Sequence, residues 1–487
     1  MLVVRFFPGS LGTPIFHEKE SVRIGRSLYS KGTIDEETYD KVAKVMSAFA
    51  GIARGVGAKE VYACATCAAR EAPDPERFRK IAKKCGIDLK IISGTEEARL
   101  TRLGVMGTYA PRRTLLIDIG GGSTEVTLAD GEEDIIQESL PLGALRLAFG
   151  SGIDPSEPVS EEDYDYLRRC VDTAVGSLAG RVREAGFDTV VGSSGTLMTL
   201  AAVCASRRGD GDDSYFTLKE LESLMEYLCT LDSKQRAKFQ KINGSRADII
   251  IGGGAVAEEL MFRMGIDRME ISGNGLREGM RLDYLIRSGW RDQNVRLSSV
   301  LSLAGRFAVD PHHGEAVARI ASDVYSRFAL AGLVRRNTVL EELMGYAARL
   351  CEVGAVSGKR SKSEITSAII RNSSMTGFEP DELETIALLA RMCRGAIPIP
   401  SSKVYSKITA DVPDQVSRAA MVLKIAEVAD RGRNGAVTGV RVSQHATHVL
   451  LTFVVDSDIS LALWKLENMQ AEFRRIFGRT LRISVMQ

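Results

Sequence analysis

A glycine-rich run, IDIGGGSTEV at Ile117–Val126, contains the residue types that phosphate chemistry needs. Consecutive glycines let the backbone approach a phosphate and point several N–H groups at it. The Ser-Thr pair adds hydroxyl donors, and Asp118, near the end of a predicted strand, can hold a hydrated Mg²⁺ beside the anion. The alternative is a plain hairpin turn, for which two residues would suffice. We predict a phosphate loop made of Gly120, Gly121, Gly122, Ser123 and Thr124.

Three further small-residue loops follow short predicted strands. VGSSGT at Val191–Thr196 leads into an apolar helical run, a favourable place for an anion or nucleotide, although many strand-to-helix turns have this composition. IGGGA at Ile251–Ala255 is weak alone. In ISGNGLREG at Ile271–Gly279, Arg277 offers a fork of donors for phosphate oxygens, with a salt bridge to Glu278 as the alternative. The candidate phosphate ligands in these loops are Gly192, Gly195, Thr196 and Arg277.

Charged residues upstream follow the ends of two other predicted strands. Arg70, in ATCAAREA, lies where an α/β sheet places its ligand crevice. Glu96 and Glu97, in ISGTEEARL, open a helix. A helix N-terminus favours acidic residues in any case, so a purely structural explanation stays open. Beside a phosphate loop, a carboxylate could instead orient or deprotonate an attacking water.

Two other motifs are predicted to be structural. Cys64 and Cys67 form a CxxC, but no second CxxC and no nearby histidine accompany them, so we expect buried, reduced thiols. GAVSGKR at Gly354–Arg360 has the wrong spacing for a phosphate-binding P-loop, and no Ser or Thr follows its lysine.

The composition is that of a globular protein. Of 487 residues, 44% are apolar and 26% charged, which excludes disordered, collagen-like and disulfide-scaffold chains. Lys plus Arg is 64 and Asp plus Glu is 63, so the formal charge of +1 argues against a nucleic-acid-binding surface. The sequence contains no run of about 18 apolar residues, so no membrane span is predicted. Dispersed cysteines and the lack of a signal-peptide pattern favour a cytoplasmic protein.

The elements that must position these residues form four predicted domains. Residues 1–103 alternate strands and helices, as expected of a largely parallel sheet with covering helices. Residues 104–285 restart that pattern. Residues 295–432 have helical periodicity and no clear strand, and residues 437–487 return to a small α+β arrangement.

The predicted elements are as follows. Strands are expected at Leu2–Phe7, Ser21–Gly25, Val61–Thr66, Leu89–Ile92, Thr114–Ile119, Thr124–Ala129, Ile135–Leu140, Thr189–Gly192, Ile249–Ile251, Met269–Ser272, Val437–Val442, Val449–Val455 and Leu481–Val485. Helices are expected at 36–54, 75–85, 161–185, 218–229 and 458–476, with another beginning near Thr95.

Six motifs, in this order, resemble one known family: ATxAxREA, ISGxEEARL, DIGGGSTE, LPLGALRL, VGSSGT and SGNGLREG. They are similar to the exopolyphosphatase and guanosine-pentaphosphate phosphohydrolase (Ppx/GppA) family, part of the actin-like, sugar-kinase-like ATPase superfamily. The resemblance is strong over residues 1–285 and weaker beyond. It implies an α/β fold class with two actin-like (ribonuclease-H-like) domains, then an all-α HD-like domain and a small α+β C-terminal domain. Four-domain exopolyphosphatases look most similar in length and layout.

The resemblance also implies a reaction. Inorganic polyphosphate, or the 5′ polyphosphate of guanosine pentaphosphate, would lie between the first two domains, and water would attack its terminal phosphoryl group in line with the help of Mg²⁺. By matching motifs, Glu97 would be the base or water-orienting group, with Glu96 as the alternative. Asp118 and Glu125 would help hold the metal, and Arg70 would bind phosphate oxygens with the glycine loop. A homodimer is expected from the resemblance alone.

The chain departs from the family pattern at its N-terminal end. In this superfamily both halves begin with a strand, a phosphate loop and a second strand, yet the first half here matches only the second and third strands of the repeat. The missing strand would sit in the middle of the sheet, and its loss would leave backbone groups unpaired. Our leading expectation is that the given sequence starts too late. The alternative is a diverged protein that has lost one phosphate loop.

The helical region departs from the pattern as well. His313 and Asp430 match HD-type metal ligands, but Cys351 and Glu352 replace the central His-Asp pair, and a metal site needs several converging ligands. We therefore predict a structural or substrate-binding domain. A basic cluster nearby could line a groove for a polyanion or be only a solvated loop. It comprises Lys359, Arg360 and Lys362.

Four functions stay open at this point. They are an exopolyphosphatase, a guanosine-pentaphosphate phosphohydrolase, an ATP-dependent sugar or acid kinase of the same superfamily, and a non-catalytic polyphosphate or nucleotide sensor. The two phosphatase substrates present the same phosphoryl end, so the sequence does not separate them. The ISGxEE and GLREG motifs belong to the phosphatase branch and speak against the kinase. The sensor is favoured only if the missing first loop is genuine.

Overall fold

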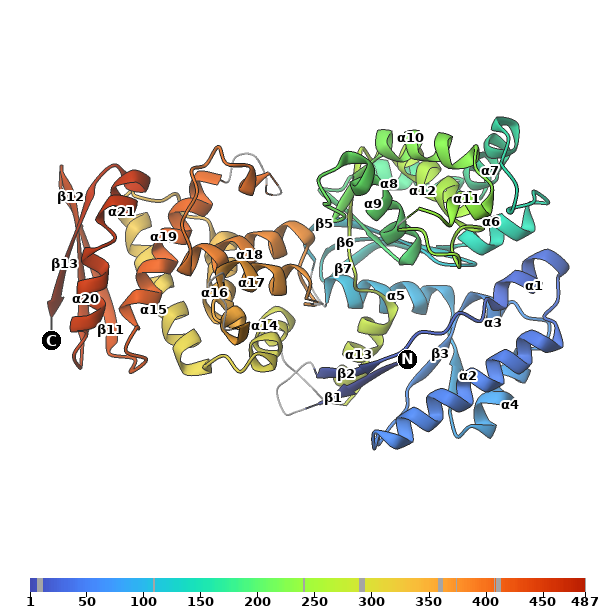
Figure 1. Cartoon of the computed structure of the whole chain (residues 1–487), viewed down its shortest axis with the longest axis horizontal. Coiled ribbons are helices and arrows are strands. Elements are labelled where there is room, and N and C mark those ends of the chain that lie inside the picture. Colours follow the sequence, from blue (N-terminus) through green and yellow to red (C-terminus); the bar gives the residue numbers. More distant parts are fainter. Residues whose placement is uncertain are drawn as a thin grey trace. The chain divides into compact units, whose positions relative to one another are not determined.

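The structure, a computed structural model, describes residues 1–6, 12–107, 110–239, 241–288, 294–357, 362–373, 375–406, 408 and 413–486. Its elements are drawn in Figure 1. It contains two compact units, Met1–Val295 and Arg296–Gln487, and each has a hydrophobic core of its own. Among the described residues, no helix is both long enough and apolar enough to cross a membrane.

A six-stranded sheet forms the centre of the first unit, in the order β7-β6-β5-β8-β10-β9. The first three strands in sequence, β5, β6 and β7, pair antiparallel, whereas β8 pairs parallel with β5, and β10 parallel with β8. Five of the six strands predicted between residues 104 and 285 are confirmed, as β5, β6, β7, β8 and β10, and β9 was not predicted. The strands are β5 (Ala110–Ile119), β6 (Thr124–Gly131), β7 (Glu133–Leu140), β8 (Thr189–Ser193), β9 (Tyr215–Thr217) and β10 (Arg268–Ile271).

Helices cover both faces of this sheet, as Figure 1 shows. Side chains alternate between the faces of a strand, so Leu115 and Ile117 of β5 pack with helices α9 and α12, whereas Leu116 packs with the end of α5. The sheet is therefore buried on both sides, and the glycine-rich loops after β5 and β8 follow the ends of two central strands. The helices of this half are α5 (Gly94–Met106), α6 (Ala144–Gly150), α7 (Glu161–Val175), α8 (Leu178–Ala185), α9 (Gly195–Arg208), α10 (Leu218–Cys229), α11 (Ser233–Arg236), α12 (Ile250–Met264) and α13 (Leu276–Arg287).

The strand predicted at Ile249–Ile251 is wrong, because helix α12 begins there and contains the glycines of IGGGA. These glycines allow helices to approach one another closely. A Cβ on Gly252 would lie 2.9 Å from a backbone oxygen of α6, and a Cβ on Gly254 would lie 2.3 Å from a methionine sulfur of α10. The composition that suggested a strand followed by a loop therefore serves helix packing instead.

The first hundred residues contain two small sheets in the part of the chain that the structure describes. β1 and β2 pair antiparallel, and β3 and β4 pair parallel, with no hydrogen-bonded strand joining the two pairs. The single, largely parallel sheet predicted here is therefore found only in part. The strands are β1 (Leu2–Arg5), β2 (Thr13–His17), β3 (Ala63–Ala65) and β4 (Leu89–Ile91).

The strand predicted at Ser21–Gly25 is also wrong, because helix α1 begins at Ile24. Val22 and Ile24 pack against a hydrophobic core, which accounts for the strand-like alternation, but Arg23 between them has a φ of 57° and turns the chain into the helix. The predicted helices at 36–54 and 75–85 are confirmed. The helices are α1 (Ile24–Lys31), α2 (Glu36–Gly55), α3 (Cys67–Arg70) and α4 (Pro75–Lys84).

Helix α5, which contains both predicted catalytic glutamates, is packed tightly against α13. A Cβ on Gly279 would lie 1.7 Å from the carbonyl oxygen of Leu100, and a Cβ on Gly104 would lie 2.0 Å from the carbonyl oxygen of Gly275. Only glycine allows backbones to approach this closely. Helix α13 therefore holds α5 in place against the sheet.

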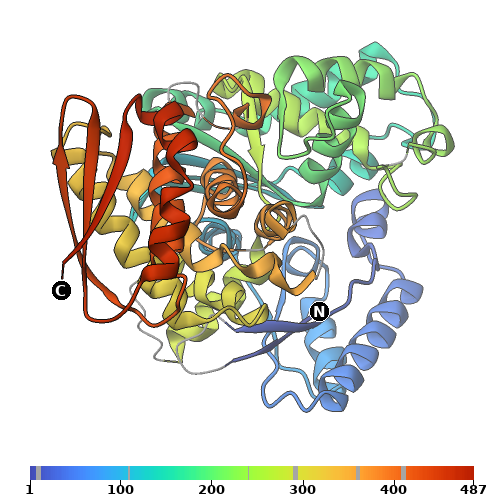
Figure 2. The same cartoon turned by 60° about the vertical axis from the view of Figure 1, so that its left-hand side comes forward.

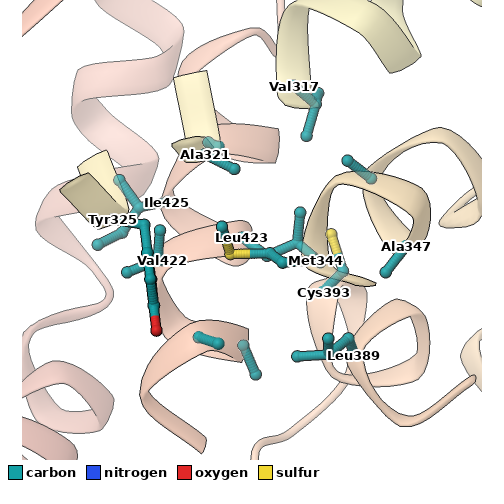
Figure 3. Packing of buried hydrophobic residues seen from close by; sticks show 14 of the residues in the cluster. Val317, Ala321, Tyr325, Met344, Ala347, Leu389, Cys393, Val422, Leu423 and Ile425 are labelled. Carbon is teal, nitrogen blue, oxygen red and sulfur yellow. The ribbon is translucent and has the colours of Figure 1, made fainter. Parts of the chain in front are cut away.

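The second unit begins with helices, as predicted. Figure 3 shows part of its core, which includes Val317, Met344 and Leu423. The helices are α14 (Val295–Arg306), α15 (Pro311–Leu330), α16 (Thr338–Leu350), α17 (Lys362–Arg371), α18 (Pro380–Arg394) and α19 (Pro413–Ala429), with short 3-10 helices at Val353–Ser357 and Lys403–Tyr405.

A three-stranded sheet and two helices complete the second unit (Figure 2). They share a core with the preceding helices, since Phe328 of α15 lies 5.4 Å, between ring centroids, from Phe477. The four predicted domain limits stay predictions, although α5 crosses the limit placed at residue 103. The elements are β11 (Val437–Gln444), β12 (His448–Val455), β13 (Thr480–Met486), α20 (Ser460–Glu467) and α21 (Gln470–Phe477).

Candidate active site

Three carboxylates converge where α5 lies on the sheet. Glu97 is in the first turn of α5, which is capped by the Ser93 hydroxyl accepting from the backbone N–H of Glu96 at 3.1 Å. Asp118 stands one residue before the end of β5, and Glu125 is its direct cross-strand partner on β6. Side chains paired in this way point to the same face, with Cβ atoms about 5 Å apart. The strand register therefore places Asp118 and Glu125 next to each other.

Burial raises the pKa of all three carboxyl groups. Burial raises the pKa of Glu97 to about 7, a rise that Arg70 opposes and the Asp118 carboxylate reinforces. Burial likewise raises the pKa of Asp118 to about 6 and that of Glu125 to about 8, the latter with contributions from Glu97 and Asp118. Crowded carboxylates in a buried place favour binding of a positive charge.

Hydrogen bonds from strands and helices orient the cluster. The Thr101 hydroxyl donates to Asp118 Oδ2 at 3.3 Å, and the Ser139 hydroxyl donates to Glu125 Oε1 at 2.8 Å. Ser139 faces Glu125 in the β6–β7 register. Neither hydroxyl residue was predicted as a site residue, although Ser139 directly precedes the LPLGALRL motif.

Arg70 reaches the cluster from α3, as the sequence predicts for a residue just past a strand end. Its Nη1 donates to the carbonyl oxygen of Ile92 at 2.6 Å and lies 3.5 Å from Glu97 Oε2. Arg70 is thereby held beside the carboxylates, and a guanidinium in this place has further N–H groups suited to phosphate oxygens.

The structure separates the two adjacent glutamates. Glu96 forms an ion pair with Arg99 at 2.7 Å and lies 3.6 Å from Arg287, and the hydrogen bonds from Arg99 lower the pKa of Glu96. Glu97, one residue on, faces the carboxylate cluster instead. Of the two candidates, only Glu97 lies with the other predicted site residues.

The glycine loop after β5 is packed from one side. A Cβ on Gly122 would lie 1.9 Å from the Tyr29 hydroxyl, and Arg146 Nε donates to the Gly122 carbonyl oxygen at 2.7 Å. The Gly120 N–H donates to the carbonyl oxygen of Ser123 at 2.9 Å, which closes the turn. The loop is thus a tight turn with a fixed backbone, as phosphate binding through N–H groups requires.

Thr124 and the CxxC motif take structural places in this region. The Thr124 hydroxyl is buried and donates to the carbonyl oxygen of Leu142 at 2.9 Å, an arrangement that does not favour its predicted phosphate contact. Cys67 is buried against the glycine loop, Cys64 is half-buried, and both are free thiols.

The second predicted loop, VGSSGT, lies beside the carboxylates. Ser193 pairs with Asp118 in the parallel β5–β8 register. Ser194 has a φ of 106° and a ψ of 159°, a conformation that costs about 1–3 kcal/mol in a residue other than glycine and clusters at functional sites. Gly195 follows at the start of α9. Gly192 and Thr196 are buried and packed against other side chains, and Arg277, in the first turn of α13, contacts the His17 ring.

The residues present fit a hard cation such as Mg²⁺, since the donors that meet here are carboxylate and hydroxyl oxygens. Within the described residues, no three His, Cys, Asp or Glu side chains are close enough together to hold a metal ion. Mg²⁺ is usually bound by one or two carboxylates together with waters and substrate phosphates. Asp118 and Glu125, paired across the strands, can supply that number.

The HD-like positions of the second unit pair with other side chains. His313 Nδ1 lies 2.7 Å from Asp430 Oδ2, while Glu352 pairs with Arg433 at 2.6 Å and with Arg394 at 2.8 Å. The predicted basic cluster is described only in part. Lys359 and Arg360 lie outside the described residues, and Lys362 is the first residue of α17.

Comparison with known proteins identifies relatives of both units. Residues 2–288 match the Ppx/GppA phosphatase family, and residues 295–470 match domain III of the Ppx/GppA phosphatases. Exopolyphosphatase 1 of Mycobacterium bovis (strain ATCC BAA-935 / AF2122/97) is 33% identical over 292 residues, which are 58% of this chain and 84% of that protein.

Two solved structures share the fold. The crystal structure of an exopolyphosphatase from Cytophaga hutchinsonii ATCC 33406 matches with a TM-score of 0.52 at 23% identity, over 57% of this chain and 91% of the other. An exopolyphosphatase-like protein matches with a TM-score of 0.51 at 22% identity, over 58% of this chain and 92% of the other. Together with the described elements, these matches confirm the predicted fold class, with two actin-like domains followed by a separate helical domain.

Proposed function

The chain belongs to the Ppx/GppA phosphatase family, and we propose that it is an exopolyphosphatase that hydrolyses the terminal phosphoanhydride bond of inorganic polyphosphate with Mg²⁺. The observation that carries the proposal is the cluster of Glu97, Asp118 and Glu125 beside a tight glycine loop. Phosphoryl transfer depends on positioning and charge neutralisation more than on covalent chemistry. The glycine loop would position the phosphate, and Arg70 and a cation held by the carboxylates would neutralise its charge.

Each group of the cluster has a part in the proposed reaction. Water attacks the terminal phosphorus, its proton passes to Glu97, the bridging P–O bond breaks, and the shortened chain leaves with the bridging oxygen. A carboxylate with a raised pKa is suited to accept a proton near neutral pH. Arg70 neutralises phosphate oxygens, and the loop N–H groups hold them in place. Mg²⁺, when bound through Asp118 and Glu125, would neutralise charge on the phosphoryl oxygens.

Guanosine pentaphosphate is the alternative substrate, since it presents the same phosphoryl end. The relative named exopolyphosphatase, at 33% identity, favours polyphosphate. The ratio of kcat/KM for the two substrates decides between them. A homodimer and a cytoplasmic location belong to the same proposal and rest on the resemblance and on composition.

The proposal is tested by phosphate release from long-chain polyphosphate with Mg²⁺. We expect Glu97→Gln to lose kcat by about 10²- to 10⁴-fold, because the general base is removed while the shape of the side chain is kept. Glu96→Gln is the matched control, since it makes the same change one residue away in a side chain paired with Arg99. Unchanged turnover in a folded Glu97→Gln variant would remove Glu97 from the mechanism, and no release by the wild-type chain would refute the function.

A further inference from the structure

The LPLGALRL motif, residues 140–147, takes no part in the proposed reaction, yet it lies directly behind the glycine loop. The carbonyl oxygens of all three loop glycines accept hydrogen bonds from this motif. Two of the donors are backbone N–H groups at the start of α6, and the third is a side chain. The pairs are Ala144 N–H to Gly120 at 3.0 Å, Leu145 N–H to Gly121 at 2.8 Å, and Arg146 Nε to Gly122 at 2.7 Å.

These bonds decide which way the loop N–H groups point. In a trans peptide bond the N–H points opposite to the carbonyl that precedes it. The N–H groups of Gly121, Gly122 and Ser123 are therefore directed away from α6. Helix α6 packs on the α12 face of the sheet through Leu147, whereas the carboxylate of Asp118 faces α5 on the other side. The motif thus turns the loop N–H groups toward the side on which the carboxylates lie.

Arg146 differs from the other two donors because its bond to the loop is made by a side chain. Its Nη2 also pairs with Glu71 Oε1 at 2.7 Å, at the end of α3. The guanidinium lies 4.5 Å from the ring centroid of Tyr29, whose hydroxyl is packed against Gly122. A guanidinium is always charged and presents its donors in a fixed fork. One arm of this fork therefore holds the loop while the other holds α3.

Glu71 directly follows Arg70, so this ion pair connects the two groups that are proposed to bind phosphate oxygens. Arg70 follows β3, whereas the glycine loop follows β5. Among the described residues, no strand pairing joins the sheets of these two strands. The contact between Arg146 and Glu71 is therefore a direct tie between Arg70 and the loop, and it fixes their spacing before a substrate arrives.

The exposure of the ion pair indicates what it contributes. The side chains of Arg146 and Glu71 are 24% and 37% exposed. Ion pairs with this much exposure add little to the stability of a fold. Glycine, in contrast, leaves a backbone free to rotate. Loss of the bond to Gly122 would let its carbonyl oxygen turn toward the phosphate, where its partial negative charge repels the anion.

We propose that Arg146 is a positioning residue of the phosphate site. It holds the Gly122 carbonyl away from the substrate and, through Glu71, sets the spacing between the glycine loop and Arg70. The proposal rests on the proposed function and concerns the phosphate end that the loop binds. Arg146 lies behind the loop and acts on the substrate only through the loop N–H groups and Arg70.

The test compares Arg146→Gln and Glu71→Gln with wild type. KM and kcat are measured for phosphate release from tripolyphosphate with Mg²⁺. The tripolyphosphate Kd is measured by calorimetry in proteins that also carry Glu97→Gln, so that the ligand is not consumed. We expect Arg146→Gln to raise KM and Kd by about 10-fold or more, as for the loss of a hydrogen bond to a charged group. Glu71→Gln should raise both by about threefold or more.

Two further variants separate positioning from a general structural effect. Arg146→Lys, which keeps the charge, should recover part of the affinity. Arg113→Gln, at the opposite end of β5, should match wild type in KM and Kd. It is the matched control, because Arg113 also joins a carboxylate, Asp130 at 3.0 Å, to a backbone oxygen, that of Ala185 at 2.8 Å. The urea midpoints of all these variants should stay close to that of wild type.

Glu71→Gln also distinguishes positioning from direct binding. If Arg146 contacted the phosphate itself, removal of the neighbouring negative charge would strengthen anion binding. A lower Kd in Glu71→Gln would therefore overturn the proposal. Unchanged KM and Kd in Arg146→Gln, or an equal loss in Arg113→Gln, would overturn it as well.

The outcomes separate this proposal from the proposed function. If wild type releases phosphate and Arg146→Gln binds and turns over like wild type, the positioning role is refuted and the function stands. If wild type releases no phosphate, the function fails, and the calorimetric Kd values still decide on the positioning role. A wild-type chain that neither binds tripolyphosphate nor releases phosphate would refute both.

Discussion

Asp118 and Glu125 owe their proximity to antiparallel pairing between β5 and β6, which places the two carboxylates side by side on the face that α5 covers. Glu97 joins them from that helix. Three carboxylates with one arginine leave the site with excess negative charge, and burial raises the pKa of each. A cation is the partner that such a charge balance favours.

At the residue scale, Asp118→Asn is expected to weaken the response to Mg²⁺. The amide keeps the shape and the hydrogen bond from Thr101 but removes one of the two charges available to the metal. The Mg²⁺ concentration for half-maximal phosphate release should rise by about 10-fold or more, with a smaller change in polyphosphate KM. Asp130→Asn, on the exposed end of the next strand, is the control. A Mg²⁺ titration like that of wild type in a folded Asp118→Asn protein would exclude Asp118 as a ligand.

The sequence predicted the candidate site residues that stand in motifs and missed the neighbouring residues that depend on strand register. Glu97, Asp118 and Glu125 come together as the family resemblance implies. Ser139 and Thr101 enter through strand pairing and helix phase, which a single sequence does not reveal.

At the scale of elements, the packing of α5 against α13 positions Glu97, so Gly279→Ala should disrupt both stability and activity. The added methyl group would meet the carbonyl oxygen of Leu100, which is backbone and cannot rotate away. We expect a loss of about 3 kcal/mol or more in the free energy of unfolding, measured by urea denaturation, and reduced turnover in the fraction that folds.

The control for this prediction is Gly51→Ala in α2, a helical glycine whose Cβ would meet nothing within 4 Å. That change should raise the free energy of unfolding by up to about 1 kcal/mol, because alanine is the better helix former. Equal effects of the two substitutions would show that α5 and α13 do not depend on this close contact.

Glycine also explains where the sequence misleads at this scale. IGGGA after two isoleucines is typical of a strand running into a loop, yet the glycines lie inside α12, where neighbouring helices leave no room for side chains. The helical periodicity of 295–432 was predicted correctly because it repeats over many turns, and long patterns outweigh local composition.

At the scale of the whole molecule, the two units have separate cores and should unfold as two transitions in calorimetry. Tripolyphosphate with Mg²⁺ should raise only the transition of residues 1–295, by about 2.7 kcal/mol of stability at 100 times Kd. Met344→Ala, in the core of the second unit, should lower only the other transition, since it removes about 2–5 kcal/mol. A single transition that both changes shift would contradict this division.

The claim that water attacks the terminal phosphoryl group in this site is tested most directly by hydrolysis in ¹⁸O-labelled water. The full chain is incubated with polyphosphate and Mg²⁺, and the released phosphate and the shortened chain are analysed by mass spectrometry. The account predicts one labelled oxygen in each released phosphate and none in the shortened chain. The Glu97→Gln variant should form neither product. Label in the shortened chain, or release that persists in Glu97→Gln, would contradict it.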